Sequence, residues 1–125
     1  MKRILLAGLA FALFSGLAAA ALAGDAAAGK AIFTGKGTCW TCHGYAGVGD
    51  GPAGKALVPA PRDFSVGAFK FDADKDGKPG TDADLKLVIT KGAGAFGGNP
   101  AMAPWGHLSA KEIDDAIAYI RTLKK

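Results

Sequence analysis

The stretch Cys39-Trp40-Thr41-Cys42-His43 decides how this chain of 125 residues folds. Two thiols three positions apart, with a histidine directly after the second, form the attachment signature of a c-type haem. This spacing lets both thiols bond covalently to the vinyl groups on one edge of the porphyrin, and the histidine can then coordinate the iron. We therefore predict one covalent haem c, held by thioethers from Cys39 and Cys42, with His43 as an axial ligand.

Other uses of these thiols fit the sequence less well, because the chain contains only two cysteines. A structural zinc site of the cysteine type needs a second pair of ligands, and the other histidine, His107, stands alone. A thioredoxin-like redox pair needs a βαβ context, and the sequence has no convincing strand pattern. A chance CxxCH in a surface loop remains the plain alternative.

The beginning of the chain has the pattern of an export signal. A positive n-region precedes an apolar run over 4–23, which closes on the small-residue motif Ala21-Leu22-Ala23. We expect 1–23 to be a signal peptide and 24–125 to be one mature domain. An uncleaved anchor is the alternative, because the run could just span a hydrocarbon core of roughly 30 Å. Export fits a c-type haem, which is attached outside the cytoplasm, and predicts a bacterial periplasmic protein without stable membrane insertion.

The expected mature region is close to electrical neutrality. Lys2 and Arg3 leave with the signal, so 13 of the 15 cations remain against 11 anions, a net charge of +2. Two haem propionates would bring this value close to zero. The balance gives no support for nucleic acid or an acidic membrane as a partner.

Three segments have the patterns of helices. Asp25 is a good N-cap for the first. Thr81 and Asp84 form a capping box for the second, which covers about 82–91. A capping box also begins at Ser109, where the last helix starts. Apolar residues follow it at helical spacing: Ile113, Ala116, Ile117 and Ile120.

The remaining mature sequence is mostly loop. The segment 44–61 is rich in glycine and proline, and we expect at most one helical turn, at 52–57. The segment 65–80 is polar and irregular. With 19 glycines and no disulfide, the chain has too little core of its own, so we expect the haem-free protein to be poorly folded.

Two further motifs resemble binding sites but lack the context that such sites need. Asp72-Ala73-Asp74-Lys75-Asp76-Gly77 begins like an EF-hand calcium loop, but Ala83 stands at position twelve and no helix precedes it. A solvated turn is the better interpretation, with weak calcium binding left open. The GxGxxG match at 92–97 follows a helix rather than a strand, so dinucleotide binding is disfavoured. We interpret 92–97 as a flexible segment that leads into the loop containing Met102.

Taken together, these motifs resemble the class I mono-haem cytochromes c of the small bacterial periplasmic type. The first helix contributes Gly29 and Phe33, the CxxCH lies at 39–43, Met102 sits in Ala101-Met102-Ala103-Pro104-Trp105, and Tyr119 lies in the last helix. The resemblance implies an all-α fold in which the N- and C-terminal helices cross. A middle helix and long Gly/Pro-rich loops then surround one haem.

The resemblance also implies how the iron is held. Met102 would be the second axial ligand opposite His43, with His107 as the rival ligand and an ordinary core methionine as the plain alternative. The family fixes the proximal histidine through a proline carbonyl, which Pro59 or Pro61 could supply here. We slightly favour Pro61.

The function implied is that of a one-electron carrier rather than an enzyme, cycling between Fe(III) and Fe(II). Such a protein would be a monomer that makes transient contacts with a donor and an acceptor redox protein. The alternative is a permanent haem c subunit of a larger oxidoreductase. A catalytic or gas-sensing haem protein with an open iron is a third hypothesis, against which Met102 argues.

Overall fold

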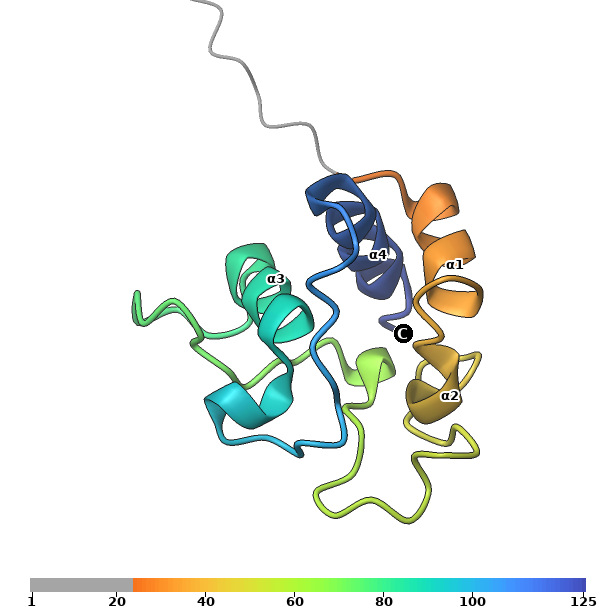
Figure 1. The fold of residues 1–125 in the computed structure, drawn as a ribbon, viewed down its shortest axis with the longest axis horizontal. Coiled ribbons are helices and arrows are strands. Elements are labelled where there is room, and N and C mark those ends of the chain that lie inside the picture. The colour runs from red at the N-terminus through yellow and green to blue at the C-terminus, as the bar shows by residue number, and fades with distance from the viewer. Residues whose placement is uncertain (1–23) are drawn as a thin grey trace, which may run out of the picture.

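The computed structural model describes residues 24–125, so the expected signal peptide at 1–23 lies outside the described residues. The described part is helical and contains no strand (Figure 1), which confirms the all-α prediction. No helix in it is long and apolar enough to cross a membrane. In chain order the elements are α1 (Ala26–Thr34), α2 (Trp40–His43), η1 (Phe64–Val66), α3 (Asp82–Lys91), η2 (Ala93–Phe96) and α4 (Ala110–Thr122).

The three predicted helices begin where their caps predict. The Asp25 carboxylate accepts the backbone N–H groups of Ala27 and Ala28 at the start of α1. The capping boxes at Thr81 and Ser109 are both complete. Sequence patterns did not predict α2, η1 or η2, which are single turns too short to show a periodicity. The segment 52–57 forms turns rather than the helical turn we expected.

Helices α1 and α4 pack against each other (Figure 1). Gly29 is buried at their contact, and a Cβ built there would overlap the backbone carbonyl of Asp115. The Asp115 carboxylate accepts the backbone N–H of Asp25 at 2.8 Å, which ties the start of α1 to α4. One turn further along, the rings of Phe33 and Tyr119 meet edge to face at 5.2 Å. Glycine at position 29 therefore sets how closely the two helices approach.

We expect Gly29→Ala to destabilise the protein by about 3 kcal/mol, the upper end of the usual overpacking cost, because the new methyl group meets backbone. The direction is informative, since the same substitution in a free helix would stabilise it by about 1 kcal/mol. Thermal melts of the holoprotein measure the effect. Gly106→Ala is the matched control, because its added Cβ would meet no atom closer than 3.3 Å. A Gly29→Ala protein as stable as the parent would contradict the close contact.

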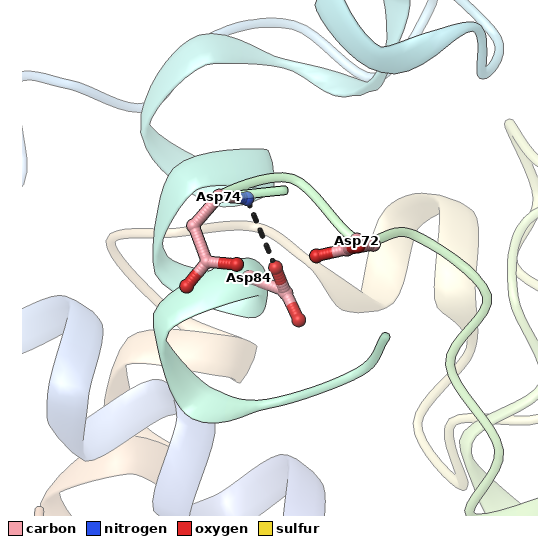
Figure 2. Close-up of side chains that lie close together, drawn as sticks. All are labelled: Asp72, Asp74 and Asp84. Carbon is pink, nitrogen blue, oxygen red and sulfur yellow. Dashed lines mark hydrogen bonds between the residues drawn. The ribbon is translucent and has the colours of Figure 1, made fainter. Parts of the chain in front are cut away.

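Asp84 fastens the 72–77 segment to the start of α3. One carboxylate oxygen accepts the backbone N–H of Asp74 at 3.1 Å (Figure 2) and that of Ala73 at 2.7 Å. The other accepts the N–H and the hydroxyl of Thr81, both at 2.9 Å. Carboxylate oxygens of Asp72, Asp74 and Asp84 lie within 4.8 Å of one another. Because both oxygens of Asp84 already have donors, this geometry favours a fastened turn over a calcium loop.

These hydrogen bonds predict an acid-dependent part of the stability. Burial alone would raise the pKa of Asp84, but the donors from Asp74, Thr81 and Ala73 outweigh it and lower the pKa from 3.8 to about 2. A carboxyl group whose pKa is lower in the folded state stabilises the fold above its unfolded pKa. That contribution is lost as the pH falls from about 4 to about 2.

We therefore expect Asp84→Asn to lower the melting temperature at neutral pH and to flatten its fall between pH 4 and pH 2. Each carboxylate oxygen accepts two hydrogen bonds, and an amide nitrogen in place of either oxygen accepts none, so two of the four hydrogen bonds are lost. Melts across this pH range measure the effect. Asp76→Asn is the control, because Asp76 is exposed and accepts only from its own turn. If the melting temperature falls equally between pH 4 and pH 2 in the parent and in Asp84→Asn, the role given to the Asp84 carboxylate is refuted.

Candidate functional site

The CxxCH forms the single turn α2, which a glycine-rich loop supports from its C-terminal side. The loop donates backbone N–H groups to the free carbonyls of the turn: Gly49 to His43 at 2.7 Å, Gly51 to Cys42 at 3.0 Å, and Ala53 to Thr41 at 2.9 Å. A Cβ at Gly51 would overlap the carbonyls of this turn. The loop thus replaces the next helical turn, and it requires glycine to approach so closely.

Cys39, the N-cap of α2, and Cys42 within it are half-buried and form no disulfide. Burial raises the pKa of Cys39 to about 11, and the neighbouring Cys42 adds to the rise against the opposing backbone hydrogen bond. Thiol–disulfide exchange requires a thiolate as the attacking group. In this apolar setting the raised pKa makes the Cys39 thiol a poor nucleophile at neutral pH, which disfavours a redox-active pair.

His43 is buried, with 8% of its surface exposed. Its Nδ1 lies 3.1 Å from the carbonyl oxygen of Arg62, and its ring stacks on Phe64 at 4.4 Å. Burial lowers the pKa of the imidazole, although the hydrogen bond to Arg62 opposes the shift. A neutral ring with Nδ1–H donating to Arg62 leaves Nε2 with a free lone pair, which is the form that binds a metal ion.

The carbonyl that accepts from His43 is not the predicted one. We expected Pro61, and the structure gives Arg62, the next residue. Successive carbonyls of an extended chain point to opposite sides, so only one of two neighbours can face the histidine. The carbonyl oxygen of Pro61 lies beside Gly49 instead. Pro61 nevertheless lines the same cavity as His43.

Met102 reaches the site on a loop fixed to the end of α3. Its carbonyl accepts the backbone N–H of Ala93 at 3.2 Å, and its own N–H donates to Asn99 at 3.1 Å. Three residues later Trp105 donates its backbone N–H to Ile89 at 2.9 Å. We expected 92–97 to be a flexible segment, and this was wrong, because residues 93–96 form the 3₁₀ turn η2. Met102 is held by backbone contacts on both sides.

One cavity of about 540 Å³ brings the predicted site residues together. Cys39, Cys42, His43, Pro61 and Met102 all line it, whereas the rival ligand His107 does not. Its volume falls within the range of sites that hold cofactor-sized ligands. The remaining lining is largely apolar and aromatic and comes from η1, α3, α4 and the loops between them, including Phe64, Phe69, Phe71, Leu85, Val88, Ile89, Trp105, Leu108 and Ile120.

This donor set fits a covalently bound haem. Two thiols, an imidazole with a free Nε2 and a thioether share a cavity whose other walls would pack against a flat apolar ring. The sequence missed the Arg62 carbonyl and the stacking of Phe64 on His43. The run of prolines before them signals a stiff, extended segment, but not which carbonyl faces the histidine.

An all-α domain with a CxxCH turn at the wall of an apolar cavity defines the class of c-type haem proteins. The Cytochrome c family model matches residues 26–124, and the chain belongs to that family. It therefore carries one covalently bound haem c and takes part in haem-based electron transfer. No curated protein matches this chain.

The fold is also similar to a solved structure. A chain of the reducing HAO-like protein complex of Kuenenia stuttgartiensis superposes with a TM-score of 0.61 and 30% sequence identity. The match covers 78% of this chain and 41% of that one. The present chain thus spans about two-fifths of the length of its structural relative.

Proposed function

We propose that this chain is an exported one-electron carrier of the bacterial periplasm that moves freely between a donor and an acceptor redox protein. Cys39 and Cys42 hold the haem through thioethers, and His43 and Met102 are its axial ligands. The observation that carries the proposal is the common cavity, which Met102 lines from a loop some 60 residues beyond the CxxCH turn.

The residues around the cavity suit a carrier rather than a catalyst. When bound, the haem supplies an iron that changes by one charge. The Arg62 carbonyl keeps His43 neutral and oriented, and a thioether from Met102 favours the reduced iron relative to a thiolate or a second imidazole. If His43 and Met102 both bind the iron, no coordination position would remain for a substrate. The apolar walls exclude water, so little else needs to rearrange when the charge changes.

A permanent haem subunit is the second candidate. It is supported by the similarity to a chain that belongs to an HAO-like protein complex and is longer than this one. A subunit of this kind would use the same cavity and ligands. The two candidates therefore differ only in whether the domain leaves its partners.

An optical and redox titration of the protein purified from its native host tests the carrier function. We expect a low-spin spectrum in both oxidation states and a reversible transition that fits one electron. A five-coordinate ferrous spectrum that binds carbon monoxide rapidly would contradict it. Gel filtration of the native extract separates the two candidates: a free monomer supports the shuttle, and strict co-elution with an oxidoreductase supports the subunit.

A further inference from the structure

The mouth of the haem cavity can be located from residues that both line it and are exposed. Among the described residues six meet both conditions: Thr38, Pro59, Ala60, Lys70, Ala101 and Ala103. Four of the six lie in two loops, 56–61 and 97–105. Asn99 joins these loops, because its side-chain amide donates to the carbonyl of Pro59 at 3.1 Å.

These two loops form a surface without charge. The segment 56–61 contains no Asp, Glu, Lys or Arg, and neither does the longer segment 92–110. All 24 charged residues of 24–125 lie elsewhere in the chain. Within these loops Val58 is 91% exposed, and Pro100 and Pro104 are also exposed. Lys70 is the one charged residue among the six at the cavity mouth, and its ammonium lies 5.2 Å from the ring centroid of Phe71.

Exposed apolar residues that surround the mouth of a cofactor cavity indicate a contact surface for another protein. A charged patch would attract its partner from a distance, and the association would weaken steeply as salt is added. An uncharged patch attracts only on contact, through the removal of apolar surface from water. A patch of two short loops suits a small and short-lived interface.

We propose that loops 56–61 and 97–105, here called the neutral rim, are the docking surface for a redox partner whose own cofactor edge is surrounded by uncharged, apolar residues. This inference rests on the proposed carrier function and adds the chemistry of the partner. Electron transfer through the neutral rim is nearly independent of ionic strength. A charge placed on the rim is left without a counter-charge in the interface, so it slows association.

The test measures second-order electron transfer to a blue-copper protein whose copper edge is surrounded by uncharged residues, used as the probe acceptor. We expect the rate constant of the parent to change by less than about twofold between 10 mM and 500 mM salt, although this change shortens the Debye length from about 30 Å to a few Å. Val58→Glu and Pro100→Glu should each reduce the rate constant at least about tenfold, because both residues are exposed in the neutral rim and neither lines the cavity. Ala27→Glu is the matched control, because Ala27 is exposed at the start of α1 and lies outside the neutral rim (Figure 1).

Each variant is first checked for an unchanged potential and for normal reduction of hexacyanoferrate, a small reagent that needs no protein interface. If the parent does not titrate reversibly with one electron, the carrier function itself fails. If it does, but its rate with the copper protein falls tenfold or more with salt, only the neutral rim is overturned. Unchanged rates in both rim variants would overturn it as well. Sedimentation of the parent as a dimer that Val58→Glu dissociates would assign the surface to a second copy and refute the proposal.

Discussion

Met102→Ala is expected to open the iron to carbon monoxide and to lower the reduction potential by on the order of 100 mV or more, within the roughly 0.8 V that axial ligands span. The substitution removes the thioether, which is the ligand that favours the reduced iron. The weak far-red sulfur–iron band should disappear with it. Optical spectra with and without carbon monoxide, together with a redox titration, measure all three effects.

Met102→Leu separates ligation from packing. Leucine has nearly the volume of methionine and keeps the apolar wall, but it offers no sulfur to the iron. We expect it to behave like Met102→Ala in ligation and like the parent in stability. Survival of the far-red band in either variant would exclude Met102 as the ligand, and loss of the low-spin spectrum in His107→Ala would assign the position to the rival.

The double variant Cys39→Ala/Cys42→Ala should lose all covalently held haem and, once any loose haem is extracted, all cooperative unfolding. The cavity of about 540 Å³ extends between the CxxCH turn, the prolines before η1, α3 and the Met102 loop, so it interrupts the apolar interior of the domain. Phe64, Leu85, Leu108 and Ile120 belong to the core cluster and also line the cavity, and without the haem their cavity-facing surfaces would have no apolar partner. Circular dichroism melts of the extracted protein measure the loss.

The single variants give a graded comparison, because each leaves one thioether. Cys39→Ala and Cys42→Ala should each retain covalent haem in part of the population and melt cooperatively in that part. A cooperative, stable melt of the double variant after extraction would show that the polypeptide forms a complete core by itself. The account of the cavity would then be wrong.

Much of the fold could be predicted from local patterns. Asp25 and the Thr81 and Ser109 capping boxes act over a few residues, so sequence spacing alone predicted where the three helices begin. The close packing at Gly29 could also be predicted, because a glycine inside a helix costs stability unless another backbone needs to approach it closely. The structure bears this out at Asp115.

The parts that the sequence did not predict depend on contacts between distant segments. The choice of Arg62 over Pro61 follows from the direction of a carbonyl in an extended run, which composition does not encode. Asp84 holds the segment 72–77 by accepting from the backbone N–H groups of Ala73 and Asp74, which lie ten or more positions earlier in the chain. A local sequence pattern does not show such a contact. Likewise η2 forms where glycines suggested flexibility, because the carbonyl of Met102 accepts the N–H of Ala93. The neutral rim was present in the sequence, but its meaning depended on both segments meeting at one cavity.

Acid–acetone extraction of the mature protein from its native host, followed by an optical spectrum and an intact mass, tests the central claim most directly. We predict that the pigment stays with the polypeptide, that the mass exceeds that of residues 24–125 by one haem, and that alkylating reagents find no free thiol. A colourless polypeptide with two titratable thiols would contradict the account.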